Sequence, residues 1–278
     1  MKRVISWCSL FVVTLLAVPS GATAQEAGKH AITFADMIQM HRVGEAQVSP
    51  DGKWVAYSVS TPDLDANRGA SNVWIVPTAG GASLQLTQSE HDSSPVWSPD
   101  GKTIAFLSSR SGDSQIYLLS MDGGEAKPLT HFSTGADNLK WSPDGKTIAF
   151  TSGVYPDCKD DACNSARDVE KDKDKVKAHV AEHLLYRHWT HWNEGKRSHL
   201  FVMPADVSAT PRDLTPGANY DVPPDERGGP SDLNFSPDSK EICFTAVTDP
   251  VEAISTNGDL FVEKFKSLGP PRSSGGTS

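Results

Sequence analysis

One short pattern in the sequence has residue types that could bind a catalytic metal. His179-Val180-Ala181-Glu182-His183 has the H-x-x-E-H spacing of one class of zinc peptidases. Two histidines one helical turn apart can share a zinc ion. The pattern is short and arises often by chance in histidine-containing helices. We therefore predict no metal and no other cofactor for this chain.

A serine nucleophile would need a sharp strand-to-helix turn with the pattern G-x-S-x-G. Gly112-Asp113-Ser114-Gln115 begins in this way, but Ile116 stands where the last glycine should be. Ser114 also opens a predicted strand rather than a helix. The sequence contains no complete pattern of this kind and no glycine-rich phosphate loop. We therefore predict no catalytic residue within this chain.

Three aromatic residues follow the histidine pattern and lie close in sequence to two arginines. These residues are Tyr186, Trp189, Trp192, Arg187 and Arg197. Such side chains can line a binding surface. Aromatic residues at helical spacing more often anchor a helix on the rest of the fold. We favour anchoring, keep the binding surface open, and leave the substrate-binding residues unassigned.

The segment before the aromatic residues predicts an amphipathic helix. Apolar residues recur at spacings of seven, four and four positions, which places them on one helical face. They are Val169, Val176, Val180 and Leu184. The charged run from Glu170 to Lys175 would form the solvated opposite face.

A repeat indicates the elements that must position these residues. Residues 97–106 read W-S-P-D-G-K-T-I-A-F and return unchanged as residues 141–150, with looser copies at residues 48–57 and 235–244. In Ser-Pro-Asp-Gly, proline presets φ, aspartate can cap its own backbone and glycine tolerates positive φ. Strand-forming residues stand on both sides, so each copy predicts a tight β-hairpin.

The spacing of the copies predicts an all-β fold of the β-propeller type. Copies at Ser49, Ser98 and Ser142 are about 45 residues apart, the length of one four-stranded blade. The last copy, at Ser236, comes after about twice that interval because a helical insertion, about Gly153 to Ser198, interrupts blade three. We expect about four blades, a fourth blade without its outer strand, and an incomplete ring.

The chain divides into four predicted regions. Residues 1–24 have a charged start, an apolar run and an Ala-Thr-Ala cleavage site, which predict a signal peptide. Residues 25–42 form a lead-in segment with a short helix at Phe34–Ile38. Residues 43–265 form the partial propeller, and residues 266–278 a disordered tail rich in glycine, proline and serine.

The net charge and the cysteines limit which binding partners and which cellular compartment fit the sequence. The formal net charge is −9, which argues against nucleic acid or an anionic membrane as the main partner. Cys158 and Cys163 are close in sequence, and in an exported chain we predict a disulfide between them. Cys243 lies between Ile242 and Phe244 and is expected to be a small buried hydrophobic residue. We expect a periplasmic or secreted protein with no membrane span after signal cleavage.

The repeats resemble those of TolB-type propellers and of the prolyl oligopeptidase family. Two other stretches are similar to bacterial dipeptidyl aminopeptidase/acylaminoacyl peptidase members. The first is I-T-F-A-D-M at residues 32–37, which leads into V-S-P-D-G-K. The second runs from residues 185–192, L-Y-R-H-W-T-H-W, to residues 195–202, G-K-R-S-H-L-F-V. The resemblance covers about residues 31–265.

This resemblance implies a function through a domain that the chain does not contain. Family members place an α/β-hydrolase domain with a Ser-Asp-His triad after a complete propeller. We therefore expect the propeller portion of an exported serine peptidase, which admits short peptides to that domain. The alternative is a non-catalytic periplasmic propeller of the TolB type that binds protein partners. In either case we expect the chain itself not to hydrolyse peptides.

Overall fold

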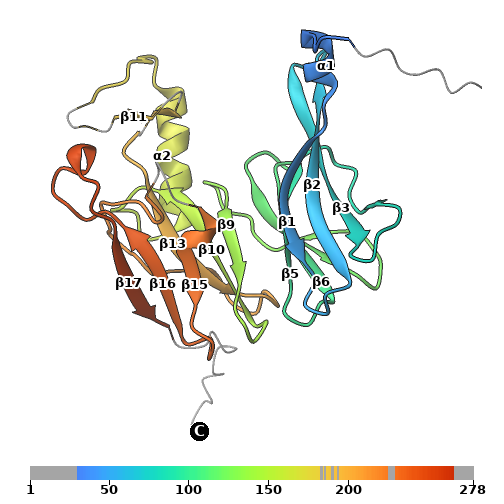
Figure 1. Ribbon diagram of the computed structural model, residues 1–278. Helices are drawn as coiled ribbons and strands as arrows, with labels where there is room; N and C mark the ends of the chain where they lie inside the picture. Colours follow the sequence, from blue (N-terminus) through green and yellow to red (C-terminus); the bar gives the residue numbers. More distant parts are fainter. Residues whose placement is uncertain are drawn as a thin grey trace, which may run out of the picture. The chain divides into compact units, whose positions relative to one another are not determined.

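The computed structural model describes residues 30–181, 184, 186–188, 191–192, 194–224 and 229–265 (Figure 1). The predicted signal peptide and the predicted C-terminal tail lie outside these residues. The chain divides into a short unit that ends at Ile38 and a large unit that begins at Gln39. None of the helices in the described part is long and apolar enough to cross a membrane.

The predicted lead-in helix is α1 (Phe34–Gln39), and all of it except Gln39 lies in the short unit. Thr33 and Asp36 cap it reciprocally. The Asp36 carboxylate accepts a hydrogen bond from the backbone N–H of Thr33 at 2.8 Å, and the Thr33 hydroxyl accepts one from the N–H of Asp36 at 3.3 Å. This pairing satisfies two donors that a helix start otherwise leaves unpaired.

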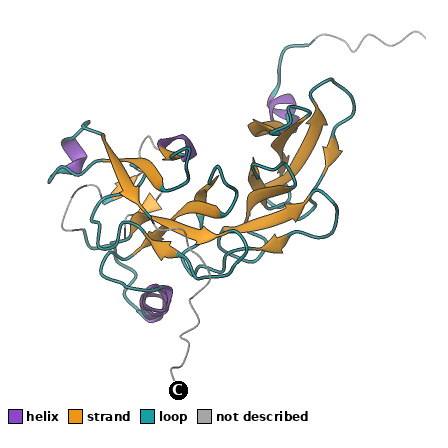
Figure 2. Ribbon diagram, turned by 90° about the horizontal axis from the view of Figure 1, so that it is seen from below, coloured by secondary structure: helices purple, strands orange, loops and turns teal. Residues whose placement is uncertain are grey.

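In the described residues, the large unit contains four antiparallel blade sheets that follow one another along the chain, and one two-stranded hairpin in the insertion (Figures 1 and 2). Blade one consists of β1 (Arg42–Val48), β2 (Trp54–Asp63), β3 (Arg68–Pro77) and β4 (Leu84–Gln85). Blade two consists of β5 (Asp92–Trp97), β6 (Thr103–Ser108), β7 (Gln115–Ser120) and β8 (Lys127–Pro128). Blade three consists of β9 (Asp137–Trp141), β10 (Thr147–Val154), β13 (Arg197–Pro204) and β14 (Arg212–Asp213). In the described residues, blade four consists of β15 (Leu233–Phe235), β16 (Glu241–Ala246) and β17 (Asp259–Lys264).

The repeated turn has the same hydrogen bonds in every blade. In blade two, the Ser98 hydroxyl donates to Asp100 Oδ1 at 2.6 Å and accepts from the backbone N–H of Thr103 at 2.9 Å. The same Asp100 oxygen accepts from the N–H of Lys102 at 3.1 Å. Corresponding bonds form at the turns that begin with Ser49, Ser142 and Ser236. The turn therefore fixes the register of the first two strands of each blade.

Turns of neighbouring blades lie against one another. A Cβ placed on Gly101 would be 3.7 Å from Pro50 Cδ, and one on Gly145 would be 3.7 Å from Pro99 Cδ. Ser239 replaces the glycine in blade four, at φ 60°. Its hydroxyl accepts a hydrogen bond from the backbone N–H of Asp144 at 3.1 Å.

A buried threonine completes the outer edge of each of the first three blades. The hydroxyl groups of Thr87, Thr130 and Thr215 accept hydrogen bonds from backbone N–H groups of the third strands at 2.9, 2.9 and 3.1 Å. The fourth strands of these blades are each two residues long. Where the backbone pairing between the third and fourth strands ends, the threonine hydroxyl accepts the hydrogen bond that a backbone carbonyl oxygen would otherwise accept.

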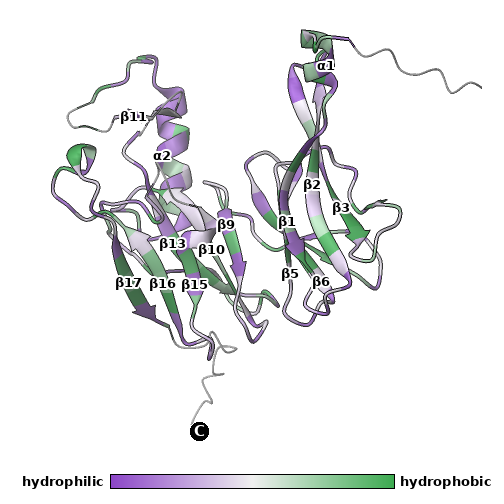
Figure 3. Ribbon diagram, viewed as in Figure 1, coloured by the Kyte–Doolittle hydropathy of each residue, from purple (hydrophilic) through white to green (hydrophobic). Residues whose placement is uncertain are grey.

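Alternate residues of the second strand face the two neighbouring blades. In β6, Ile104 and Phe106 pack towards blade one, whereas Ala105 and Leu107 pack towards blade three. Figure 3 shows green, hydrophobic bands along the strands of the blades. In β10, Ile148 and Phe150 belong to a buried apolar cluster shared with blade two. Ala149 belongs to a second buried cluster, which is shared with blade four. Three apolar cores thus join consecutive blades. No core cluster of the described residues joins blade four to blade one.

In blade four, Cys243 stands where blades two and three have alanine in the repeat, so the sequence reads I-C-F instead of I-A-F. Ile242 and Phe244 are buried against blade three, while Cys243 is half-buried and free. The prediction of a buried cysteine was therefore wrong, because alternate strand residues face opposite sides of the sheet. On the neighbouring strand, Leu260 and Val262 are 74% and 58% exposed.

The predicted apolar face of the insertion helix was also wrong. The helix α2 runs over Asp161–Lys173, so Val169 is the one member of the predicted face that lies in it. Val176, Val180 and Leu184 follow the helix and are 69%, 86% and 63% exposed. A short helix depends on packing for its stability, and the charged run from Glu170 to Lys175 provides no apolar residue to pack.

Substitution of Gly101 by alanine should destabilise the protein. The residue has φ 70°, where an L-residue costs about 1–2 kcal/mol. Urea unfolding of Gly101→Ala should show a free energy of unfolding lower by that amount. Gly258→Ala is the matched control, because Gly258 has no positive φ and no atom within 4 Å of its Cβ position. Equal midpoints for the two variants would contradict the role assigned to the turn.

Candidate functional site

The segments that extend beyond the basic repeat lie in the loops between the second and third strands of the blades. In a meander these loops lie at the end of the blade opposite the Ser-Pro-Asp-Gly turns. In blade three this loop is the insertion, which contains α2 and the short hairpin β11 (Arg187–His188) and β12 (His191–Trp192). In blade four it is the loop 247–258. Figure 1 shows both at the upper ends of their blades.

The insertion and the blade-four loop border a cleft of about 1040 Å3, here called the insertion cleft. The residues used below that line it are His179, Tyr186, Trp192, Glu194, Arg197 and Glu252. Apolar, aromatic and charged side chains all contribute to its wall. A cleft of this composition and size fits a small molecule or a few residues of a peptide.

Aromatic rings form one wall of the insertion cleft. The ring of His179 stacks on Trp192 with 4.0 Å between centroids, and Tyr186 lies 6.0 Å from the same indole. The Arg187 guanidinium lies 5.4 Å from the Trp192 ring, in cation–π range. Tyr186 and Trp192 are 44% and 40% exposed. The arrangement of these two rings favours the binding-surface alternative, while Trp189 lies outside the described residues.

The H-x-x-E-H pattern does not lie on a helix as far as the structure describes it. His179 comes after the end of α2, and its Nδ1 lies 3.4 Å from Glu194 Oε1. Glu182 and His183 lie outside the described residues. A zinc pair one helical turn apart needs a helix at this point. No group of three potential metal ligands occurs among the residues that the structure describes.

Arg197 closes the floor of the insertion cleft. Its Nη1 donates to Asp221 Oδ2 at 2.7 Å and to Glu252 Oε2 at 2.9 Å. Asp221 also accepts a bond from the backbone N–H of Ser198 at 2.6 Å. This half-buried network ties β13 to the loops before and within blade four. Sequence reasoning marked Arg197 but missed both acids, because nothing near Asp221 or Glu252 in sequence points to Arg197.

A second polar cluster holds α2 on blade three. The Tyr155 hydroxyl donates to Asp168 Oδ1 at 3.1 Å, and Lys196 Nζ donates to Asp168 Oδ2 at 2.8 Å. The Arg167 guanidinium lies 5.1 Å from the Tyr155 ring. Burial and the bond to Asp168 raise the pKa of Tyr155 to about 12. The phenol therefore stays protonated and acts as a hydrogen-bond donor at physiological pH.

The first turn of α2 is fixed by a cap and by the two neighbouring cysteines. The sulfur atoms of Cys158 and Cys163 are bonded, with 5.5 Å between their Cα atoms. Asp160 Oδ1 accepts a hydrogen bond from the backbone N–H of Cys163 at 2.9 Å. Asn164 is buried, and its Oδ1 accepts from the N–H of Tyr155 at 2.9 Å.

His199 is buried at the base of β13, and both of its ring nitrogens face acceptors. Nδ1 lies 2.7 Å from Asp213 Oδ2 and Nε2 lies 2.9 Å from the carbonyl oxygen of Ala218. Only the protonated imidazole can donate at both positions. Burial lowers the pKa of His199, but the bonds to Asp213 and Ala218 and the charges of Asp213 and Asp221 outweigh it. The net result is a pKa raised above 6.5.

Comparison with known proteins defines the class first. Residues 37–168 match the model of the TolB beta propeller domain, PD40. The predicted fold class is confirmed: the protein is a β-propeller with TolB-type repeats. The acylaminoacyl peptidase of Pyrococcus horikoshii shares the fold, with a TM-score of 0.58 at 14% identity over 82% of this chain and 32% of that chain.

Two groups of proteins are similar to this chain in sequence. The chain is 30% identical over 276 residues to dipeptidyl-peptidase 5 of Porphyromonas endodontalis, an alignment that covers 94% of this chain and 38% of that protein. It is 43% identical over 58 residues to the Tol-Pal system protein TolB of Bordetella pertussis, which covers 20% of this chain and 13% of that protein. The predicted resemblance to both groups is confirmed. The chain spans well under half the length of either relative.

Mass spectrometry should find Cys158 and Cys163 joined in protein that is isolated and alkylated without reductant, with Cys243 labelled. Replacing both residues by serine should lower the free energy of unfolding by about 2 kcal/mol or less, because the closed loop is short. Labels on both thiols before reduction would contradict the pairing.

The free energy of unfolding should fall as the pH rises above about 6.5. The reason is that His199 has a higher pKa in the folded than in the unfolded state, so its protonated form stabilises the fold. The contribution of His199 is fully present below the unfolded-state pKa and is lost as pH passes through the folded-state value. Urea midpoints between pH 6 and pH 9 should show this loss, and His199→Gln should flatten it. His131→Gln, at an exposed histidine, is the control. A slope unchanged by His199→Gln would contradict the assignment.

Proposed function

We propose that the chain is the propeller portion of an exported peptidase of the dipeptidyl-peptidase or acylaminoacyl-peptidase type. In this proposal the propeller limits access of peptides to a hydrolase domain outside residues 1–278. The substrates are short peptides or loose chain ends. Catalysis itself belongs to that other domain.

The observation that carries the proposal is the extent of similarity to dipeptidyl-peptidase 5. That similarity runs through 94% of the chain, so it includes the blade-three insertion as well as the repeats. The similarity to TolB covers 20% of the chain, a length of about one blade. The repeats alone are common to both groups, whereas the insertion distinguishes them.

The geometry of the insertion supports a role in selecting substrates by size. The insertion cleft has a volume of about 1040 Å3, which fits a few peptide residues but not a folded domain. Its aromatic wall can contact any peptide backbone or apolar side chain. The Arg197 network ties β13 to two loops, and one of them, the blade-four loop, borders the cleft.

The test uses the complete protein that contains residues 1–278, with fluorogenic dipeptidyl and acyl-aminoacyl amides and with peptides of increasing length. We expect kcat/KM to fall as the substrate lengthens, and a fluorophosphonate to abolish turnover. Trp192→Ala should weaken the dependence on length by opening the cleft. Leu84→Ala, which removes an exposed apolar side chain on β4, should not.

Residues 1–278 expressed alone should not be labelled by the fluorophosphonate. A complete protein that is neither labelled nor active would overturn the proposal and favour the non-catalytic, TolB-like alternative. Equal cleavage of short peptides and folded proteins would overturn the role in size selection alone.

A further inference from the structure

The loop 247–258 of blade four ends in Asn257-Gly258, the one Asn-Gly pair in the sequence. Both residues are exposed. Gly258 has no positive φ, and a Cβ placed on it would meet no atom within 4 Å. Its N–H donates to the carbonyl oxygen of Thr256 at 3.2 Å, which bends the chain at Asn257. Because glycine has no side chain to block close approach, the side-chain amide of Asn257 can reach the backbone nitrogen of Gly258.

The hydrogen bonds around Asn257 hold the backbone and leave the side chain loose. The N–H of Asn257 donates to Ser255 Oγ at 3.0 Å, and the Ser255 hydroxyl donates to Asp249 Oδ2. Within the described residues, the Asn257 side chain makes one hydrogen bond, from Nδ2 to Asp259 Oδ2 at 3.4 Å, which is longer than usual for such a bond. This contact directs the amide along the chain, past Gly258, towards β17.

The acid–glycine pairs of the repeated turns are held more tightly. In blade two, Asp100 Oδ1 accepts a hydrogen bond from the Ser98 hydroxyl at 2.6 Å and one from the N–H of Lys102 at 3.1 Å. The N–H of Gly101 donates to the carbonyl oxygen of Ser98 at 2.9 Å. A carboxyl group held in this way cannot rotate onto the nitrogen of the following glycine, whereas the Asn257 amide is free to do so.

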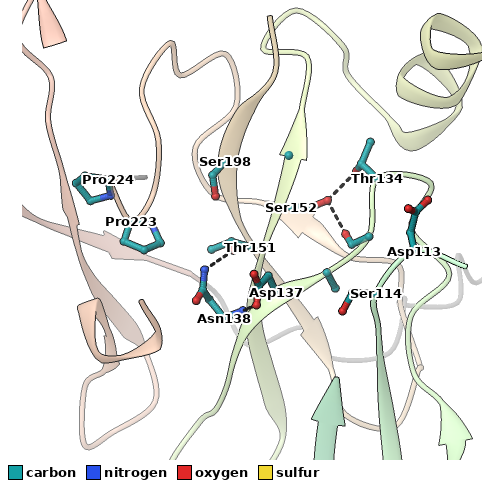
Figure 4. A pocket seen from close by; sticks show the side chains of 13 residues that line it. Asp113, Ser114, Thr134, Asp137, Asn138, Thr151, Ser152, Ser198, Pro223 and Pro224 are labelled. Carbon is teal, nitrogen blue, oxygen red and sulfur yellow. Dashed lines mark hydrogen bonds between the residues drawn. The ribbon is translucent and has the colours of Figure 1, made fainter. Parts of the chain in front are cut away.

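Asn138 shows the same restraint for an asparagine. It lies in β9, in the wall of the hollow shown in Figure 4, where its Nδ2 donates to the Thr151 hydroxyl oxygen at 3.0 Å. The next residue, Leu139, is buried, and a leucine side chain hinders approach to its backbone nitrogen. Asn138 and Asn257 therefore differ both in the freedom of the amide and in the residue that follows.

We propose that Asn257 is a site of spontaneous deamidation. Hydroxide removes the proton from the Gly258 nitrogen, and this nitrogen forms a bond to Cγ of Asn257. The bond between Cγ and Nδ2 breaks, and Nδ2 takes a proton from water and leaves as ammonia, which restores the hydroxide. Water then opens the resulting cyclic imide at either carbonyl carbon, which gives aspartate or isoaspartate at position 257. No step oxidises or reduces any atom.

The modification changes the loop that borders the insertion cleft. Either product adds a negative charge beside Asp259, and isoaspartate also adds one methylene group to the main chain before β17. The first pair of the β16–β17 ladder, Ala246 with Asp259, follows directly. On the other side, the bonds of Ser255 connect Asn257 to Asp249, which lines the cleft. The proposal does not depend on the proposed function, because both reacting groups lie in this loop.

The test incubates the complete protein that contains residues 1–278 at pH 7 and at pH 9 and maps its peptides by mass spectrometry. Asn257 should gain the mass difference between an amide and an acid, and faster at pH 9, because the attack requires the deprotonated nitrogen. Asn138 should keep its amide, and so should Asn219, which is exposed but precedes tyrosine. Isoaspartyl methyltransferase with a labelled methyl donor should methylate the incubated protein and not the fresh protein.

Gly258→Ala tests the geometry without straining the backbone. The added methyl group hinders the attack, so deamidation at Asn257 should be severalfold slower. Gly153→Ala is the matched control and should leave the rate unchanged, because Gly153 also has no positive φ and no atom within 4 Å of its Cβ position. Asn257→Gln should abolish methylation at this position, since the longer side chain must close a larger ring.

An Asn257 amide that persists through prolonged incubation at pH 9 would overturn the proposal. So would equal rates of deamidation at Asn257 and Asn219, or equal rates in the wild-type protein and in Gly258→Ala. These results would leave the proposed function untouched, because the cleavage of peptides is measured separately and does not depend on the state of position 257.

Discussion

The architecture depends on one packing constraint: a blade has two apolar faces, and each must be covered by another sheet. The repeat I-A-F meets this constraint with side chains of different size. Ile104 and Phe106 fill the space towards the preceding blade, and Ala105 allows the following blade to approach closely. Because interiors are close-packed, a bulky face must meet a face with room for it. The alternation of large and small side chains in I-A-F therefore determines which face of a blade packs against the preceding blade and which against the following one.

The ends of the blades are under a different constraint, and this is where the candidate sites lie. At one end, the turns share one hydrogen-bond pattern, because serine and aspartate have the same role in all four and glycine takes the positive φ in three. At the other end, the loops differ in length and are held by charged side chains such as Arg197 and Asp168. Variation is tolerated there because the apolar cores do not extend into these loops.

Local chemistry explains which features could be predicted from the sequence. The hairpins, the blade spacing and the position of the insertion follow from turn residues and strand patterns that are close together in the chain. The end of α2 and the half-buried position of Cys243 could not be predicted, because both depend on what packs against them. The partners of Arg197 come from distant segments, and no pattern within one segment marks Asp221 or Glu252.

The insertion has a consequence for how the protein reaches its fold. In blade one, β2 and β3 are joined by a loop of a few residues, whereas the pairing of Val154 with Arg197 must close a loop roughly tenfold longer. The entropy of closing that loop adds about 2 kcal/mol. Blade three is therefore the non-local step in an otherwise local meander. The contacts of Tyr155 and Lys196 with Asp168 shorten the loop that remains open, so docking of α2 would speed the assembly of blade three.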